Sequence, residues 1–346
     1  MSHPKIQMVD LQRQYSAIQT EMDEAIGTVI AEAHFVGGRQ VQQFADELAQ
    51  YLRVEHLIPC GNGTDALQIA LMALGLQRGD EVISVSNSFV ATAEVIALLG
   101  LRPVWVDNDP RTFTIDVQQI EAAISPRTKA IIPVHLYGQS ADMEPILQLA
   151  KKYGLYVVED NAQAIGADYR FADGRIAKTG TMGDIGCTSF YPSKNLGCYG
   201  DGGAIFTNDT VIAAKLRQIA NHGQKIKYAS DMIGINSRLD SLQAAILSVK
   251  LKHLDDYNAR RQAVAQYYDS AFATVPNITI PYRAAYSTHV FHQYTVLFPQ
   301  HRNHIKQRLA ELGIPTMIYY PIPIHQQKAY HQLYKGQMPL PNTEYL

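Results

Sequence analysis

Short apolar segments alternate with segments of helical periodicity between residues 57 and 160, and this alternation restricts the possible folds more than any other feature. Strands that are separated by single helices join a mainly parallel sheet through right-handed crossovers. The predicted strands are 57–60, 81–85, 103–107, 130–135 and 156–160, and the predicted helices between them are 64–74, 91–99, 117–124 and 143–153. The sequence therefore predicts an α/β fold, and ligands of such folds bind beyond the carboxyl ends of the strands.

The flanking regions have different patterns. Helices are predicted at residues 11–33 and 40–52 before the alternating region, and a long helix is predicted at 241–271 after it. A strand at 291–297, a helix at 304–312 and a strand-like segment at 314–320 follow, and residues 339–346 offer no closing element. We therefore expect a large domain at 1–240 and a smaller α+β domain at 241–346 that lacks its last segment.

The composition excludes several classes of partner. The net charge is −2 and the pI is about 6.6, so the chain has no basic field that would attract nucleic acid. Residues 1–5 hold no apolar signal core, and no stretch is long and apolar enough to span a bilayer. The three cysteines have no metal-ligand spacing and suit a reducing compartment. We expect a cytoplasmic protein without a metal site.

Lys194 lies in a loop that is a candidate for covalent chemistry. It follows an apolar strand in Thr-Ser-Phe-Tyr-Pro-Ser-Lys-Asn-Leu-Gly (residues 188–197) and precedes a glycine-rich run at 197–203. Partial burial would remove a proton from its ammonium group and make the amine a nucleophile. A surface lysine in a turn is the alternative. Ser189, at the start of the same loop, could contribute a hydroxyl to a phosphate site.

Two further motifs come directly after predicted strands. Gly-Asn-Gly-Thr-Asp-Ala-Leu (residues 61–67) could bind a phosphate at a helix N-terminus, and it is neither a P-loop nor a dinucleotide fingerprint. An ordinary turn capped by Thr64 or Asp65 is the alternative. Asp160 ends an apolar strand, with Gln163 three residues later. Its carboxylate could pair with a protonated pyridine nitrogen, or it could simply cap a helix.

The fourth motif is Gly-Ile-Asn-Ser-Arg-Leu-Asp (residues 234–240), directly before the long predicted helix. Asn236 and Arg238 could reach anions, although Asp240 could equally be a helix cap with Arg238 as its solvated pair. Phe89, on the loop after the second strand, could stack on a planar ring or belong to the core.

Together, in this order, the four motifs resemble the pyridoxal-phosphate (PLP) sugar aminotransferases of the DegT/DnrJ/EryC1/StrS group, which have the fold of aspartate aminotransferase (fold type I). The resemblance runs from about Ile6 to the end of the chain. It implies that Lys194 binds the cofactor as an internal aldimine, that Asp160 pairs with the ring nitrogen and that Gln163 contacts the ring hydroxyl. It further implies that Phe89 stacks on the ring.

The resemblance also implies the remaining cofactor contacts and the partners. The amides of Gly63, Thr64 and Asp65 hold the phosphate with Ser189, and Asn236 reaches it from the other subunit of a homodimer with composite sites. L-Glutamate is the usual donor of the group, and the pyridoxamine form of the cofactor then aminates a nucleotide-linked keto sugar.

Within the group, the segment around Lys194 is most similar to enzymes that aminate C3 of UDP-2-acetamido-3-oxo-glucuronate for surface polysaccharide such as the O-antigen of lipopolysaccharide. The resemblance assigns Arg238 to the acidic side of that sugar, and we expect Tyr191, Tyr320 and His325 to contact substrate. That branch has His-Tyr where this chain has Tyr319-Tyr320. Alternatives are a dTDP-linked 3-oxo-6-deoxyhexose as substrate, a non-catalytic PLP-binding regulator, and a sugar dehydratase, in which a histidine would replace Lys194.

Overall fold

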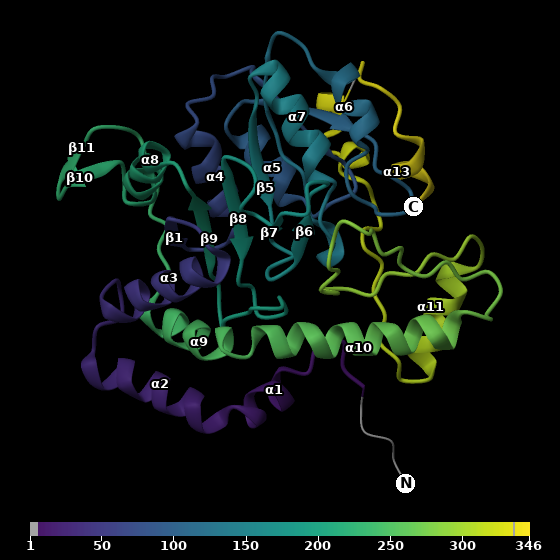
Figure 1. The fold of residues 1–346 in the computed structure, drawn as a ribbon, viewed down its shortest axis with the longest axis horizontal. Helices are drawn as coiled ribbons and strands as arrows, with labels where there is room; N and C mark the ends of the chain where they lie inside the picture. The colour runs from purple at the N-terminus through teal and green to yellow at the C-terminus, as the bar shows by residue number, and fades with distance from the viewer. Residues whose placement is uncertain (1–5, 335) are drawn as a thin grey trace.

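A seven-stranded sheet forms the centre of the molecule in the computed structural model, which describes residues 6–334 and 336–346 (Figure 1). The strand order is β1-β9-β8-β5-β4-β2-β3, and β9 runs antiparallel to both of its neighbours. All other neighbouring strands are parallel. The predicted α/β fold with a mainly parallel sheet is confirmed.

The strands of the central sheet are β1 (His56–Cys60), β2 (Glu81–Val85), β3 (Arg102–Val106), β4 (Thr128–Ile131), β5 (Tyr156–Asp160), β8 (Ile185–Ser189) and β9 (Gly203–Thr207). The helices that connect and flank them are α4 (Gly63–Ala73), α5 (Ala91–Leu98), α6 (Val117–Ala123), α7 (Met143–Tyr153) and α8 (Thr210–Ala220). Two short hairpins project from this unit, β6 (Asp168–Arg170) with β7 (Ile176–Lys178) and β10 (Gln224–Ile226) with β11 (Ala229–Ser230).

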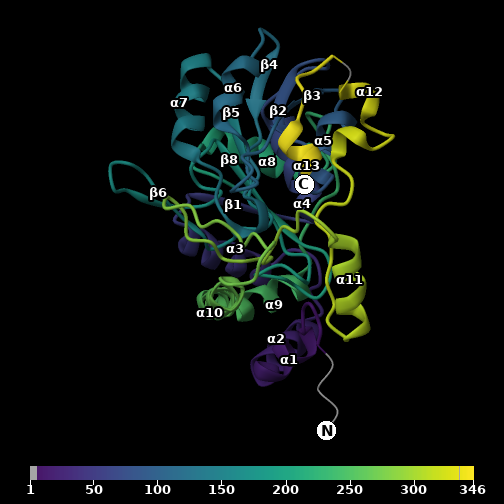
Figure 2. The same ribbon diagram turned by 90° about the vertical axis from the view of Figure 1, so that its right-hand side faces the viewer.

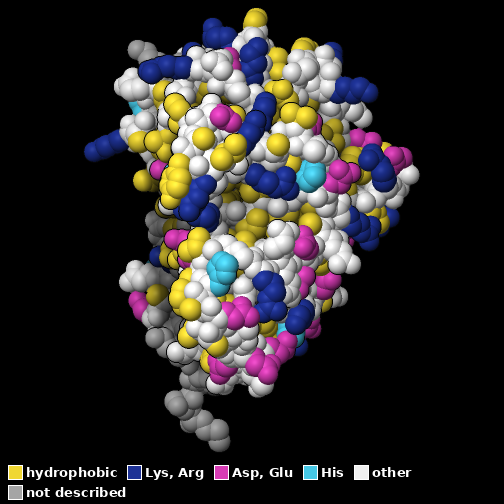
Figure 3. Space-filling view, turned by 90° about the vertical axis from the view of Figure 1, so that its left-hand side faces the viewer, with side chains coloured by type: hydrophobic (Ala, Val, Ile, Leu, Met, Phe, Trp, Pro, Cys, Tyr) yellow, Lys and Arg dark blue, Asp and Glu magenta, His cyan; other side chains and the backbone are white. Residues whose placement is uncertain are grey.

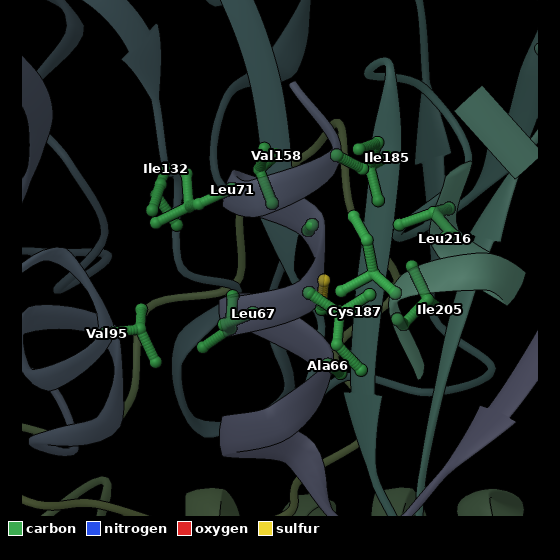
Figure 4. Packing of buried hydrophobic residues seen from close by; sticks show 14 of the residues in the cluster. Ala66, Leu67, Leu71, Val95, Ile132, Val158, Ile185, Cys187, Ile205 and Leu216 are labelled. Atoms are coloured by element: carbon green, nitrogen blue, oxygen red, sulfur yellow. The ribbon is translucent and has the colours of Figure 1, made fainter. Parts of the chain in front are cut away.

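The central strands are largely buried and rich in apolar residues because both faces of the sheet are covered. On one face, side chains of α4, α5 and α8 pack on the strands, as Figure 4 shows for Leu67, Val95 and Leu216. Helices α6 and α7 cover the other face (Figure 2). Their side chains Ile120 and Ile146 are buried there. The central strands thus form the middle layer of three.

Helices form a further layer below the sheet in the view of Figure 1. They are α1 (Leu11–Ala17), α2 (Gln19–Glu32), α3 (Arg39–Leu52), α9 (Ser241–Leu251) and α10 (Leu254–Phe272). The single helix expected at 11–33 is interrupted at Ile18, and the one expected at 241–271 is interrupted at Lys252 and His253. α9 packs against α2 and α3. The domain boundary that we predict near residue 240 falls at the start of α9.

The C-terminal region departs from the expectation. Residues 291–297 and 314–320 form no regular strand, and only an isolated bridge joins Thr279 to Leu297. The helices of this region are α11 (Arg302–Glu311), α12 (His331–Tyr334) and α13 (Pro341–Tyr345). The expectation that the last residues form no element is wrong, because the Asp107 carboxylate accepts the amides of Asn342 and Thr343, both at 2.8 Å, and holds the first turn of α13.

Candidate active site

The ends of three central strands lie side by side. Asp160 at the end of β5 pairs with Cys187 in β8, and Ser189 at the end of β8 pairs with Gly203, which also pairs with Cys60 at the end of β1. The loops after these strands therefore emerge at one edge of the sheet. These loops carry the first three motifs found in the sequence.

Lys194 lies in a turn after β8 and is partly buried. Its amide donates to the carbonyl of Tyr191 at 2.8 Å, which closes the turn. Burial lowers the pKa of the Lys194 amine to about 8, and the charge of Asp160 partly opposes this shift. About a tenth of the amine is therefore unprotonated at pH 7, far more than for a lysine in water, and this is the form that attacks a carbonyl carbon. The alternative of a solvated surface lysine is wrong.

The Asp160 carboxylate is buried and accepts two hydrogen bonds from uncharged donors. Its Oδ2 accepts from Thr92 Oγ1 at 2.7 Å and its Oδ1 accepts from the amide of Ala162 at 3.2 Å. Only 6% of the residue is exposed, and no Lys or Arg in residues 6–334 and 336–346 forms an ion pair with it. No helix begins directly after β5, so the alternative role as a helix cap is wrong. A buried carboxylate of this kind is suited to a cationic ligand.

Gln163 connects two other parts of the site. Its Oε1 accepts from the amide of Tyr137 at 2.7 Å, and its Nε2 donates to the hydroxyl of Tyr320 at 2.9 Å. The ring of Phe89 lies 6.4 Å from that of Tyr320, and Phe89 is 56% exposed. Phe89 therefore borders the site and does not belong to the core. The structure thus brings Gln163, Tyr320 and Phe89 together.

The N-terminus of α4 faces Ser189. A Cβ atom on Gly63 would come within 2.7 Å of the Ser189 Cβ, so only glycine allows this approach. The helix cap is Asn62 and not Thr64 or Asp65 as the alternative held, because Asn62 Oδ1 accepts the amide of Asp65 at 2.8 Å. The first-turn amides of Gly63 and Thr64 have no acceptor within the helix, and such amides are suited to binding an anion.

The segment 234–240 contacts the 61–67 motif through one serine. Ser237 Oγ accepts from the amide of Gly61 at 2.8 Å and donates to Asp65 Oδ2 at 2.6 Å. Asn236 and Arg238 are exposed, and within the described residues their polar contacts are to Asn221, not to Lys194 or Asp160. Arg238 also pairs with no carboxylate there, so the alternative of a solvated pair with Asp240 is wrong.

An open groove of about 940 Å³ lies beside Arg238, on the face of the molecule that bears the hairpin β10–β11 (Figure 3). Its lining includes Lys227 from the hairpin and Met232 and Ile233 from the loop after it. Several of these side chains are strongly exposed, among them Tyr228 at 86% and Ile233 at 87%.

The other expected substrate contacts differ in their surroundings. Tyr191 is 56% exposed at the exit of β8. His325 is buried, and both ring nitrogens are occupied, Nδ1 by Ser86 Oγ at 2.7 Å and Nε2 by Glu344 Oε1 at 3.2 Å. The Glu344 carboxylate can only accept, so Nε2 carries the proton of the neutral ring and Nδ1 accepts from the Ser86 hydroxyl. His325 therefore fixes the loop that carries Phe89.

Two residues of the site were not expected from the sequence. Thr92 and Tyr137 each bind a predicted site residue, yet they lie 68 and 26 positions from it along the chain. Thr92 lies inside a helix, and Tyr137 has a left-handed backbone with φ of 58°. The sequence offers no local signal for either.

With the geometry established, comparisons with known proteins identify the family. The model of the DegT/DnrJ/EryC1/StrS aminotransferase family matches residues 16–346. The chain belongs to this family. It is thus a PLP-dependent sugar aminotransferase of fold type I.

Named relatives agree with this assignment. The UDP-2-acetamido-2-deoxy-3-oxo-D-glucuronate aminotransferase of Pseudomonas aeruginosa is 48% identical over 94% of this chain and 88% of its own length. The UDP-N-acetyl-3-dehydro-alpha-D-glucosamine 3-aminotransferase of Acidithiobacillus ferrooxidans is 45% identical over 99% of this chain and 90% of its own. The crystal structure of DesV from S. venezuelae in complex with a ketimine intermediate superposes with a TM-score of 0.93 at 40% identity, covering 99% of this chain and 91% of that one.

The described residues fit the cofactor of this family. A buried amine of lowered pKa, a buried carboxylate without a cation and a glycine that makes room beside Ser189 are placed at one edge of the sheet. They match the carbonyl, the ring nitrogen and the phosphate of PLP in that order. No helix among the described residues is long and apolar enough to cross a membrane, and those residues hold no cluster of three or more metal-ligating side chains.

Proposed function

We propose that the enzyme moves the amino group of L-glutamate to C3 of a UDP-linked 3-oxo sugar, UDP-2-acetamido-2-deoxy-3-oxo-D-glucuronate, in the biosynthesis of a surface polysaccharide. The observation that carries the sugar assignment is that the relatives at 48% and 45% identity are both named for UDP-linked sugars oxidised at C3. Both matches extend over most of each chain. We further propose that the protein is cytoplasmic and has a large domain at 1–240 and a smaller one at 241–346.

Each site residue has a proposed role. Lys194 holds the cofactor through Nζ and, when freed, takes the α-proton of the amino acid and returns it to the product. Asp160 keeps a proton on the ring nitrogen, since its buried carboxylate favours a charged partner. Gln163 holds the ring hydroxyl, and Phe89 stacks on the ring. When bound, PLP supplies the electron sink that makes the α-proton removable.

The phosphate site is proposed at the start of α4. The amides of Gly63 and Thr64 and the hydroxyl of Ser189 are free to bind a phosphate, whereas the amide of Asp65 already donates to Asn62. Of the three amides expected from the family, that of Asp65 is therefore the least available. The partial positive charge of the α4 N-terminus favours the same anion.

Arg238 and Asn236 are proposed to act across a homodimer. Both are exposed in the single chain, and Arg238 pairs with no carboxylate among the described residues. A free guanidinium can bind the carboxylate of a uronate through two hydrogen bonds, which a lysine cannot do. Tyr191 and Tyr320 are proposed to contact the sugar.

The experiment that tests the function is amination of a panel of nucleotide sugars by the purified holoenzyme with L-glutamate, with mass spectrometry of the products. We expect the fastest turnover with the 3-oxo-glucuronate, a slower reaction with its uncharged 3-oxo-glucosamine counterpart and little with 4-oxo sugars. A higher kcat/KM for a dTDP-linked 3-oxo-6-deoxyhexose would replace the proposed substrate with the alternative. If no sugar of the panel is aminated, the result would favour the alternative of a non-catalytic PLP-binding regulator.

Arg238→Lys tests whether Arg238 recognises the carboxylate of the uronate. We expect it to raise KM for the 3-oxo-glucuronate about tenfold and to change KM for 3-oxo-glucosamine much less, because only the uronate presents a carboxylate. An equal effect on both sugars, or an effect on the glutamate half-reaction alone, would remove Arg238 from sugar recognition.

A further inference from the structure

The segment 289–293 contacts the neighbours of Lys194 and Gln163. Its Val290 carbonyl accepts from Nδ2 of Asn195, the residue after Lys194, at 3.0 Å. Its Gln293 amide donates to the carbonyl of Tyr137, whose own amide binds Gln163. The segment therefore lies directly against the loops that carry the two cofactor-binding side chains.

Side chains of α10 hold this segment from the other side. Gln262 Nε2 donates to the His289 carbonyl at 3.1 Å, and Arg261 Nη1 donates to the carbonyls of Phe291 at 3.0 Å and His292 at 3.2 Å. Arg261 makes no ion pair within the described part of the chain, so its guanidinium serves the segment alone. The carbonyls of residues 289–292 thus all have side-chain donors.

The backbone of the segment is strained at one position. Phe291 has a φ of +46°, which non-glycine residues rarely adopt. His289 stabilises this conformation, because its Nδ1 accepts the Phe291 amide at 3.1 Å and its ring stacks on the Phe291 ring at 3.8 Å. Strain that several contacts hold in place is typical of residues that orient a functional neighbour. The neighbour here is His292.

The His292 side chain has no structural partner among the described residues. Its Nδ1 is buried and makes no hydrogen bond with any of them. Burial, and then the charges of Lys194 and Arg261, lower the pKa of His292 well below its ordinary value, so the imidazole is neutral. An unpaired buried nitrogen is unfavourable unless a ligand satisfies it.

We propose that His292 is a substrate-contacting residue whose Nδ1 hydrogen-bonds an oxygen atom of the molecule that reacts at Lys194. The inference rests on the proposed aminotransferase function and extends it by one residue. The oxygen belongs either to the carboxylate of the amino donor or to a hydroxyl of the keto sugar. Both substrates occupy the space above Lys194 in turn, and the two half-reactions distinguish them.

Three substitutions test the contact at the holoenzyme. Asparagine places an amide atom close to the position of Nδ1, glutamine places one close to Nε2, and alanine removes both. We expect His292→Ala and His292→Gln to lower kcat/KM about tenfold in the half-reaction that uses the contact, and His292→Asn to keep it within about threefold of wild type. The exposed His304 on α11 supplies the control, and His304→Ala should leave both half-reactions unchanged.

The melting temperature of the cofactor-free protein provides a second measurement. His292→Ala removes an unpaired buried nitrogen, so we expect the melting temperature to stay the same or to rise. His289→Ala is the matched structural variant on the same segment, and it should lower the melting temperature because it removes the partner of the Phe291 amide.

Two results would overturn the inference. One is wild-type kcat/KM for His292→Ala in both half-reactions, and the other is a loss of melting temperature equal to that of His289→Ala, which would show a structural role. A wild-type enzyme that aminates no sugar would instead contradict the proposed function. In that case the glutamate half-reaction alone tests the role of His292. Equal rates of that half-reaction in the wild-type enzyme and His292→Ala would overturn the inference.

Discussion

Lys194 is the residue whose chemistry depends most on its surroundings. Its amine has a pKa of about 8 because it is buried, whereas a lysine in water titrates near 10.4. The unprotonated form therefore accumulates above about pH 8. We expect the rate at which an amine-specific reagent labels Lys194 in cofactor-free protein to rise with pH to a midpoint near 8, as measured by mass spectrometry of the peptide. A midpoint above 10 would show that the amine is solvated.

Asp160 makes a second residue-scale prediction. Asp160→Asn replaces the carboxylate with a neutral amide of the same shape, so the ring nitrogen loses the charge that keeps it protonated. Loss of a hydrogen bond between charged groups corresponds to about 1.5–3 kcal/mol, or roughly ten- to a hundredfold in kcat, and loss of the electron sink adds to it. Stopped-flow rates of the glutamate half-reaction measure the effect.

Thr92→Val is the matched control, because it removes one donor and leaves the charge. It should reduce the rate far less than Asp160→Asn does. Similar losses for both variants would mean that geometry rather than charge matters at Asp160, and an unchanged rate in Asp160→Asn would exclude it from the mechanism.

At the residue scale, the sequence predicts site residues that come directly after a strand and misses those that pack on its end from elsewhere. Lys194 and Asp160 could be recognised because each lies at or after the carboxyl end of an apolar strand, which must reach the ligand side of a parallel sheet. Thr92 and His292 could not, since their positions depend on how distant helices and loops fold over that edge. The contact between Thr92 and Asp160 spans 68 positions.

At the element scale, the N-terminus of α4 contains both a stabilising helix cap and the proposed phosphate site. Asn62→Ala removes the side-chain acceptor for the Asp65 amide, and loss of such a cap costs about 1 kcal/mol. Asn62→Asp keeps an acceptor but adds a negative charge near the proposed phosphate site. We expect urea unfolding to show destabilisation only for alanine, and PLP titration to show the weaker affinity for aspartate. Unchanged PLP affinity in Asn62→Asp would place the phosphate elsewhere.

Most strands of the sheet were predictable, whereas the antiparallel strand β9 and the elements of the C-terminal region were not. Strands buried on both faces are rich in apolar residues, as in β2, where every residue is buried and Val82, Ile83 and Val85 are apolar. The segment 291–297 also contains apolar and aromatic residues, but the side chain of Arg261 binds the carbonyls at its start. Gln262 and Asn195 bind the carbonyls of the two residues before it. Local pattern does not reveal such partners, so a strand was predicted where a fixed loop lies.

At the scale of the whole molecule, we predict a homodimer with composite sites. A Lys194→Ala subunit and an Asn236→Ala/Arg238→Ala subunit should each be inactive alone. Mixed dimers should recover activity, because one of their two sites then has intact residues from both chains. Amination by the mixture, with subunit exchange shown by native mass spectrometry, measures the effect. Absence of recovery despite exchange would mean that Asn236 and Arg238 act within their own chain.

Ser237 has a consequence for how such a dimer would respond to its cofactor. Its hydroxyl ties the 61–65 turn of one site to the segment 234–240, which is proposed to serve the other. Occupancy of one phosphate site would then order the segment that completes the second, and by linkage the effect is reciprocal. Reconstitution of the apoprotein should therefore be cooperative, with a Hill coefficient above one, and Ser237→Ala should bring it close to one.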